Sequence, residues 1–446
     1  MFRNYIGFFF IFGALLGIFF GRTDWVPADE VSCEIVVAGG GSAGIAAALF
    51  AGEAGSSTIL LEATHQIGGN TTSGGVSYPG LFHAWGKQVI AGPAWDLILK
   101  TVKLNGGKLP DFTKPVGRAH SKLQISINPA LFVLTAEETL QEKGVEIRYY
   151  ESPSSLKKTA EGWILTTSAM GETRTIHCKQ LIDCTGNGAL CAMAGAKRLR
   201  EKEVQPGTMN YLLETKKQPT LRDKKEWNKL LEEAVQKGTL RPEDIRSDLF
   251  SAFKPGRSSS FNYVYEADNS TAEKRTETNL RGRAAVLRVL RFMRTLPGLE
   301  DARIVSFCPE VGVRETWRVR GDYLITVDDY TSGKVWDDSL CFAYYPVDLH
   351  TNATGVHPKQ LTEGIVPTIP LRAMLPAGVE NMLVAGRCIS SDRLANSGLR
   401  VQGACMSGGQ AAAAAAVIAS RENTTVRSVS IKAVKDLLKK YGCIVP

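Results

Sequence analysis

Short apolar runs alternate with small-residue stretches over the first part of the chain. Glu34–Ala38 and Thr58–Glu62 predict two buried strands, and the small, apolar segment Ile45–Ala54 between them predicts a helix that packs closely on a sheet. Asn128–Lys143 has the apolar spacing of a helix, and Val145–Tyr150 follows it as a strand. This order of strands and helices predicts a parallel sheet that is covered by helices.

Two later parts of the chain continue the same pattern. Trp163–Thr167 and Thr173–Cys178 predict a hairpin, which leads into the buried strand Gln180–Cys184. Asn381–Arg387 predicts a strand that enters a glycine turn, and Arg400–Ser420 predicts a long helix of small residues. We therefore expect both parts to belong to the first domain.

The stretch between these parts differs in composition. From Gln205 to Pro376 charge rises, Trp and Tyr appear and the short α/β units disappear, which predicts a second domain. Within it, Arg281–Arg294 predicts an amphipathic helix and Arg314–Arg320 alternates like a strand. The last helix, Ile431–Tyr441, has one apolar face, and we expect it to dock on the body of the protein, with membrane association as the alternative.

These patterns predict an α/β fold. A Rossmann-like dinucleotide-binding domain with a parallel sheet would be discontinuous in sequence, because an α+β substrate domain is inserted into it. We expect the first domain to comprise residues 33–204 and 377–420, the inserted substrate or cap domain residues 205–376, and a C-terminal helix residues 428–446.

The first residues are typical of an export signal. Arg3 precedes the uncharged, apolar run Tyr5–Gly21, which is short for the ~20 residues that a membrane span needs. Val26-Pro27-Ala28 offers small residues for cleavage. We therefore expect residues 1–28 to be a signal peptide and the protein to be exported to the periplasm or secreted. An uncleaved membrane anchor through residues 5–21 is the alternative.

Composition excludes several classes of function. The net charge of +8 comes from dispersed Lys and Arg, and the most basic stretch, Lys216–Lys229, also carries acids, so we expect no nucleic-acid partner. The nine cysteines form no CxxC pair and no Cys/His cluster with zinc spacing, which predicts no metal site. Cys184, Cys388 and Cys405 lie in apolar surroundings that are typical of buried thiols.

A glycine-rich turn carries the clearest chemistry. The segment Gly39–Gly44 lies between two predicted strands, and Glu62 ends the second of them. Gly39 suits a tight turn, Gly41 lets backbone amides approach a pyrophosphate, and Gly44 lets the helix pack on the strand. The carboxylate suits a ribose diol, and the N-terminus of the helix favours phosphate. The turn therefore predicts a bound dinucleotide.

A second glycine-rich loop, Gly68–Gly75, follows directly. It is too polar for a strand or helix, and its backbone amides suit the phosphate and sugar-alcohol part of the cofactor, although a surface loop is the alternative. A third turn, Thr185–Gly188, follows the predicted strand at Gln180 and is expected beside the same cofactor.

In the first and third of these glycine turns, and in three further segments, the chain resembles the FAD-dependent oxidoreductase family of the glutathione-reductase-like flavoproteins with two dinucleotide-binding domains. The resemblance spans most of residues 33–420 and implies FAD as the bound dinucleotide. Many members carry a histidine directly after the serine that corresponds to Ser391, whereas this chain has Asp392 and Arg393. Any chemical role of that histidine must therefore be filled by another residue here. The matching segments are Val36–Gly44, Leu181–Gly188, Gly312–Arg318, Tyr345–His350 and Asn381–Gln410.

The resemblance implies contacts along the whole length of FAD. The Gly39–Gly44 turn would bind the pyrophosphate, Glu62 the adenosine ribose, and Gly69–Thr71 the stretch towards the flavin. Gly386 and the start of the Arg400 helix would lie beside the isoalloxazine, where the helix dipole stabilises negative charge. The residues expected to contact FAD are Gly39, Gly41, Ser42, Ala43, Gly44, Glu62, Ala63, Gly69, Asn70, Thr71, Gly186, Gly386, Arg400 and Val401.

FAD performs the redox step, so the protein needs a group that moves one proton and a charge that orients the substrate. His350 and His83 are the candidates for proton transfer. His350 ends a Tyr-Pro segment that we expect in the active-site cleft. His83 follows the glycine loop, and a structural histidine is its alternative reading.

Arginines are the candidates for the orienting charge. Arg314 and Arg387 would bind an anionic or polyhydroxyl substrate near the flavin, and Arg318 is a third candidate. The alternative for Arg314 and Arg318 is structural pairing with nearby acids, namely Glu310, Glu315 and Asp322.

The sequence thus favours an exported FAD-dependent dehydrogenase that acts on a small polar substrate, hydroxylated or sugar-like. A fumarate-reductase-like C=C reductase and a non-catalytic flavin-binding protein are the alternatives. Since no second GxGxxG motif follows, the electron acceptor or donor is unknown, and a quinone, a small redox carrier or oxygen fits equally.

Overall fold

The structure is a computed structural model, and it describes residues 30–113, 120–217, 223–245, 256–351, 355–356 and 359–446. The predicted export signal lies outside these residues. In the part that the structure describes, no helix is both long and apolar enough to cross a membrane.

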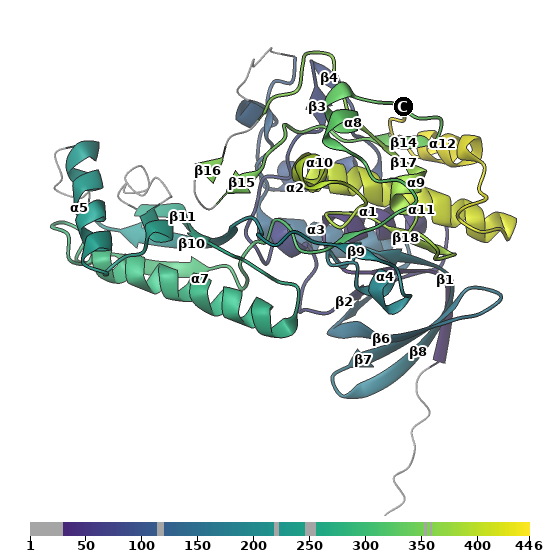
Figure 1. Ribbon diagram of the computed structural model, residues 1–446, viewed down its shortest axis with the longest axis horizontal. Coiled ribbons are helices and arrows are strands. Elements are labelled where there is room, and N and C mark those ends of the chain that lie inside the picture. Colours follow the sequence, from purple (N-terminus) through teal and green to yellow (C-terminus); the bar gives the residue numbers. More distant parts are fainter. Residues whose placement is uncertain (1–29, 114–119, 218–222, 246–255, 352–354, 357–358) are drawn as a thin grey trace, which may run out of the picture.

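A mostly parallel sheet forms the centre of the first domain (Figure 1). Its parallel strands are adjacent in the order β5-β2-β1-β8-β18, and the hairpin β6–β7 continues from β8 in antiparallel pairing. The strands that the apolar pattern predicts here are present, because the paired centre of the sheet is covered on both faces and is buried. The segments Thr173–Cys178 and Gln180–Cys184, which were predicted as separate strands, form the single strand β8. The strands are β1 Glu30–Ala38, β2 Thr58–Glu62, β5 Val145–Tyr149, β6 Glu151–Lys158, β7 Trp163–Ala169, β8 Glu172–Asp183 and β18 Met382–Val384.

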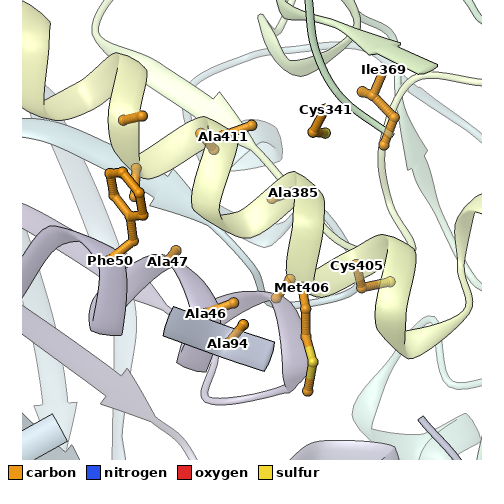
Figure 2. Packing of buried hydrophobic residues seen from close by; sticks show 14 of the residues in the cluster. Ala46, Ala47, Phe50, Ala94, Cys341, Ile369, Ala385, Cys405, Met406 and Ala411 are labelled. Carbon is orange, nitrogen blue, oxygen red and sulfur yellow. The ribbon is translucent and has the colours of Figure 1, made fainter. Parts of the chain in front are cut away.

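Two helices of small residues cross closely over this sheet. Helix α1 (Ser42–Glu53) packs against α11 (Gln402–Glu422), and Figure 2 shows Ala46, Ala47 and Phe50 facing the second helix. A side chain on Gly409 would lie 2.2 Å from the carbonyl oxygen of Ala43, so only glycine permits this approach. The small-residue pattern of both helices therefore has its cause in this contact.

The long helix of small residues predicted at Arg400–Ser420 is present as α11, which starts slightly later. Helix α10 (Arg393–Leu399) ends first, Val401 is extended, and α11 then begins at Gln402. The first-turn amide of Gly403 has no acceptor within α11 and donates to the carbonyl oxygen of Pro79 at 2.7 Å, which fixes the start of the helix against the loop before it.

A separate core lies in the inserted region. Strands β10 (Gly207–Thr215), β11 (Gly256–Val264) and β12 (Arg303–Phe307) form an antiparallel sheet, over which α5 (Lys224–Gln236) and α7 (Ala272–Met293) pack. In Figure 1 this unit projects to one side of the main sheet. The predicted amphipathic helix is present as α7 and is longer than its apolar pattern indicated.

Apolar residues between Ile325 and Leu375, a stretch that the sequence placed with the second domain, pack in the core of the first. Tyr330, Cys341 and Ile369 are buried there with the alanines of α11. The alternating segment Arg314–Arg320 is largely irregular, because its only ladder among the described strands is the short pair of Arg318–Val319 with Arg198–Leu199.

The remaining elements connect or cover these cores. The C-terminal helix α12 (Ile431–Lys440) docks through Val434, Leu437 and Leu438, as its apolar face predicts. The other helices are α2 Pro93–Leu104, α3 Pro129–Glu142, α4 Ala189–Met193, α8 Val327–Ser332 and α9 Leu371–Met374, with 3₁₀ turns at Gly69–Thr71, His120–Leu123 and Pro242–Ile245. The other strands are β3 His83–Ala84, β4 Lys87–Gln88, β9 Arg198–Leu199, β13 Arg318–Val319, β14 Ser339–Phe342, β15 His350–Thr351, β16 Gly355–Val356 and β17 Thr368–Pro370.

Candidate active site

Four parallel strands end side by side at one edge of the main sheet. Ala38 of β1 is in register with Leu61 of β2 and with Asp183 of β8, and Asp183 is in register with Val384 of β18. The turns that follow these strands line a cavity of about 340 Å³. Ligands of open parallel sheets bind outside the carboxyl ends of the strands, so this cavity is the candidate cofactor site.

In the turn after β1, a side chain on Gly39 or Gly44 would clash with the protein itself, whereas a side chain on Gly41 would only fill space that a ligand can use. A Cβ on Gly44 would lie 1.8 Å from the carbonyl oxygen of Gly39, and one on Gly39 would lie 2.5 Å from that of Cys184. A Cβ on Gly41 would meet no atom within 4 Å, and Gly41 lines the cavity. The protein alone does not require glycine at Gly41. The space there fits a phosphate group against the N-terminus of α1.

Arg387 brings a positive charge to the cavity wall. Its Nε donates to the carbonyl oxygen of Gly186 at 3.0 Å and its Nη1 to that of Val313 at 3.2 Å. Burial lowers the pKa of this guanidinium. Within the described ranges Arg387 forms no ion pair, so its charge is held at the cavity by neutral carbonyl groups.

A cluster of four ionisable residues begins beside this cavity, and we name it the Asp348 cluster: Asp348, His350, Arg314 and Arg400. Asp348 Oδ2 lies 3.2 Å from His350 Nε2 and 3.4 Å from Arg400 Nη2. Arg400 also lines the cavity, which places the cluster next to the cofactor site. The structure therefore brings His350 and Arg314, two candidates from different parts of the sequence, into one site.

The protonation states in this cluster follow from burial and charge. Burial acts to raise the pKa of Asp348, but the hydrogen bond from His350 and the charge of Arg400 outweigh it, so this pKa is lowered. Burial lowers the pKa of His350 to about 4 despite the bond to Asp348. At neutral pH a neutral imidazole therefore donates its Nε2 proton to an ionised carboxylate.

This arrangement leaves one nitrogen of His350 as a free base. The Nδ1 atom is buried and has no hydrogen-bond partner among the described residues. Since Nε2 carries the proton, Nδ1 has the lone pair. A histidine that a carboxylate orients in this way is suited to accept a proton from a substrate.

The hydrogen-bond partners of Arg314 are neutral groups. Its Nη1 donates to the carbonyl oxygen of Pro206 at 2.5 Å and to Thr208 Oγ1 at 3.0 Å. Burial and the neighbouring charge of Arg400 lower the pKa of Arg314 to about 10, so the group stays cationic at neutral pH. Its guanidinium also lies 5.7 Å from the ring centroid of Tyr263, a cation–π contact.

The structural ion pairs considered for Arg314 are not formed. Its three possible partners pair elsewhere, and these pairs are Glu310 with Arg275, Glu315 with Arg393, and Asp322 with Arg427. Arg318 does have a structural role, because it is buried and its Nη2 donates to Glu201 Oε1 at 2.6 Å.

His83 lies outside this site. Its ring stacks on Phe112, with centroids 3.7 Å apart, and meets Trp95 edge-on at 5.5 Å. Burial lowers the pKa of His83 to about 4, and His83 is not among the described residues that line the cavity. This packing favours the structural reading of His83 over the catalytic one.

The segment that departs from the resembled family is also structural. Asp392 caps α10 by accepting from the amide of Ala395 at 2.8 Å, and Arg393 pairs with buried Glu315 at 2.8 Å. Neither residue has a free acid or base group, so His350 is the better candidate for proton transfer.

A family profile described as "FAD dependent oxidoreductase" matches residues 34–438 of this chain. The chain belongs to the FAD-dependent oxidoreductase family. Its cofactor is FAD, as the family resemblance implied, and its fold and class of enzyme are those expected from the sequence. No curated protein matches the chain.

Solved structures similar to this FAD-dependent oxidoreductase share little sequence with it. A geranylgeranyl bacteriochlorophyll reductase-like protein from Thermoplasma acidophilum is 11% identical, with a TM-score of 0.44 over 92% of this chain and 84% of that chain. The p-nitrophenol 4-monooxygenase PnpA from Pseudomonas putida is also 11% identical, with a TM-score of 0.43 and the same coverage. The myxobacterial chondrochloren halogenase CndH is 14% identical, with a TM-score of 0.41 over 92% and 79%. Likenesses this distant carry no argument about the substrate.

Most residues expected to contact FAD line the cavity. Three do not, and each has a structural reason: Gly44 packs on Gly39, Thr71 is fully buried, and Val401 packs with Leu81. Thr71 instead supports the wall, because its hydroxyl donates to Gln402 Oε1 at 2.7 Å. The residues that line the cavity are Gly39, Gly41, Ser42, Ala43, Glu62, Ala63, Gly69, Asn70, Gly186, Gly386 and Arg400.

Glu62 has a role beyond the predicted ribose contact. Its Oε2 accepts from the amide of Gly40 at 2.8 Å, and its Oε1 accepts from the amide and hydroxyl of Thr64, each at 2.8 Å. The carboxylate therefore ties the glycine turn to the end of β2. It also lines the cavity, so the ribose contact remains a prediction.

The sequence missed cavity residues that come from the second domain. Asn269, Arg275 and Glu310 line the same cavity as the glycine turn. Asn269 is only 7% exposed, and its Oδ1 has no partner among the described residues. No local motif marks these residues, because their position depends on how the inserted domain packs. Cys184 and Cys405 also line the cavity, and burial raises the pKa of Cys405 to about 12.

Proposed function

We propose that this protein is an FAD-dependent dehydrogenase that oxidises an alcohol group of a small polar substrate. The observation that carries the proposal is the hydrogen bond of 3.2 Å between His350 Nε2 and Asp348 Oδ2, which leaves Nδ1 as an unpartnered base in a cluster whose Arg400 lines the cofactor cavity. Oxidation of an alcohol needs such a base, because the hydroxyl proton must leave when the C–H bond breaks.

The roles of the residues follow from their positions. FAD, when bound, supplies the acceptor for the hydride that leaves the substrate carbon. His350 Nδ1 accepts the hydroxyl proton, and Asp348 orients the imidazole and stabilises the imidazolium. The sequence predicted Arg387 as a charge that orients the substrate, but its place on the cavity wall beside Gly186 suits the cofactor instead. The amides near Gly41 and the cation of Arg387 would hold the pyrophosphate.

Three further parts of the proposal rest on the sequence. The two-dinucleotide-binding-domain architecture of the glutathione-reductase-like flavoproteins is the proposed superfamily. Export to the periplasm or secretion is proposed from the apolar run at residues 5–21, with a membrane anchor as the alternative. The electron acceptor is proposed to be a separate molecule, such as a quinone, a small carrier or oxygen.

The experiment that tests the reaction is anaerobic reduction of the holoenzyme. A panel of alcohols, polyols and hydroxy acids is screened for bleaching of the flavin band, and the best substrate is then used in stopped flow. We expect His350→Gln to slow flavin reduction by roughly 10²–10⁴-fold with FAD still bound. His83→Gln, the matched control outside the site, is expected to reduce at the wild-type rate.

The pH dependence provides a second readout. Because the pKa of His350 is lowered to about 4, the wild-type reduction rate should be flat at neutral pH and fall as the pH approaches 4. If no alcohol bleaches the flavin, or if both histidine variants slow reduction equally, the proposed reaction is wrong.

A further inference from the structure

The Asp348 cluster holds more positive than negative charge. Its two guanidinium groups, Arg314 and Arg400, face one carboxylate, and Arg400 is the one paired with it, at 3.4 Å. Arg314 donates to a carbonyl and a hydroxyl oxygen instead. The side chains of Asp348 and Arg400 are 16% and 11% exposed, so water screens this excess charge poorly. A cationic group in such a place favours an anionic ligand.

The cluster also has an unused donor and an unused acceptor. Arg400 Nε and His350 Nδ1 are both buried without a hydrogen-bond partner among the described residues. Buried polar atoms of native proteins are nearly always paired, and leaving one unpaired costs ~1–3 kcal/mol. A ligand that fills the site must therefore accept from the arginine and donate to the histidine.

These two atoms belong to neighbouring side chains. His350 and Arg400 contact the same oxygen of Asp348, at 3.2 and 3.4 Å. The ring of Tyr263 lies next to both Arg314 and His350, with its centroid 5.7 Å from the Arg314 guanidinium and 6.3 Å from the centroid of the His350 ring. Because the two side chains meet at one carboxylate oxygen, a small ligand with its accepting and donating groups on adjacent carbons suits both of them.

We propose that the substrate is a 2-hydroxy acid, whose carboxylate is bound by Arg314 and Arg400 and whose hydroxyl faces His350. The carboxylate accepts from the guanidinium groups, and the hydroxyl donates to Nδ1. With FAD bound as the two-electron acceptor, oxidation would transfer the C–H hydride to the cofactor and the hydroxyl proton to His350 Nδ1, and the product would be the 2-oxo acid. This inference rests on the proposed dehydrogenase function and adds the class of its substrate.

The test compares acids with neutral counterparts in the holoenzyme. Lactate, malate and gluconate are each set against the analogue in which the carboxylate is an amide or CH₂OH, and anaerobic flavin reduction is measured. In parallel, oxalate, which cannot be oxidised by hydride loss, is titrated while the flavin absorbance is followed. We expect acids to reduce the flavin at least tenfold faster than their neutral analogues, and oxalate to perturb the spectrum.

Variants of Arg314 test whether its positive charge binds the carboxylate or whether the residue only supports the fold. Arg314→Gln should weaken oxalate binding by roughly 10–150-fold, the value of a charged hydrogen bond, and Arg314→Lys should recover part of it. Arg283→Gln is the control, because Arg283 lies on α7 and donates to the carbonyl oxygen of Pro309. It should leave oxalate binding unchanged.

Each outcome decides between the two proposals. Equal reduction by acids and neutral analogues, or oxalate binding that does not depend on Arg314, overturns the hydroxy-acid inference and leaves the dehydrogenase intact. If another alcohol reduces the flavin but no hydroxy acid does, the hydroxy-acid inference fails and the dehydrogenase stands. If oxalate binds through Arg314 but no hydroxy acid or other alcohol reduces the flavin, both proposals fail while the anionic site stands, and reoxidation of reduced enzyme by fumarate then tests a C=C reductase.

Discussion

Replacing Arg387 by glutamine should weaken FAD binding without weakening the fold. The guanidinium is buried at the cavity wall, and its partners are the carbonyl oxygens of Gly186 and Val313, at 3.0 and 3.2 Å. Glutamine keeps an N–H donor for one carbonyl and removes the charge. Burial lowers the pKa of Arg387, which means that the fold holds this charge at a cost when no anion is present.

The expected changes in FAD affinity and in stability follow from the role of the Arg387 charge with and without FAD bound. A hydrogen bond between a cation and a pyrophosphate oxygen contributes about 1.5–3 kcal/mol, so loss of one such bond should raise the Kd for FAD by roughly 10–150-fold. In the apoprotein the change removes a buried charge and keeps one hydrogen bond. We therefore expect its free energy of unfolding to stay within about 1 kcal/mol of wild type.

The assay measures both quantities on the same preparations. FAD is removed, and its rebinding is followed by the quenching of flavin fluorescence, while urea unfolding of the apoprotein gives stability. Arg318→Gln is the matched control, since Arg318 is also buried but pairs with Glu201 at 2.6 Å. It should lose stability and retain FAD affinity. The reasoning is refuted if Arg387→Gln loses apoprotein stability and binds FAD as tightly as wild type.

Two further predictions follow from the same residues. Gly41→Ala should fold, because its Cβ meets no protein atom within 4 Å, but it should lose FAD affinity, because the Cβ takes the space of the phosphate group. Gly44→Ala should fail to fold, because its Cβ would lie 1.8 Å from a carbonyl oxygen. Circular dichroism and the flavin content of the purified proteins distinguish the two variants. Acid should also destabilise the protein through His350, whose folded pKa of about 4 lies below the ordinary 6.5, so that stability present above pH 6.5 is lost as the pH falls to about 4. That loss is about 3 kcal/mol, and wild type and His350→Gln should differ by this amount in the pH dependence of urea unfolding; parallel curves would contradict it.

The sequence predicted the cofactor half of the molecule well, since that half is built from local signals. Apolar runs mark β1, β2 and β8, and the glycines of the turns lie at fixed distances from these strands. The parallel pairing then brings the strand ends together, as in the register of Ala38 with Asp183. Local pattern and sheet geometry are therefore enough to locate the FAD cavity.

The sequence predicted the second domain and its cavity residues less well, because their structure depends on tertiary contacts. Arg314–Arg320 alternates like a strand, but a strand needs a partner, and only Arg318–Val319 finds one among the described strands. Likewise, no composition or period signals that Asn269 and Arg275 reach the cofactor cavity, because the packing of the second domain on the first decides it.

The sequence also could not decide which histidine is the catalytic base. His350 and Arg314 were chosen for their residue types, but type alone could not separate His350 from His83. The difference is in their partners: His350 has a carboxylate that fixes its tautomer, at 3.2 Å, whereas His83 has the face of Phe112, with ring centroids 3.7 Å apart. Both have a pKa lowered to about 4 by burial, so a shifted pKa does not identify the base either. Both also have a buried Nδ1 without a partner among the described residues. What identifies the base is the combination of an orienting carboxylate and two neighbouring cations, one of which, Arg400, lines the cofactor cavity, and this combination requires the fold.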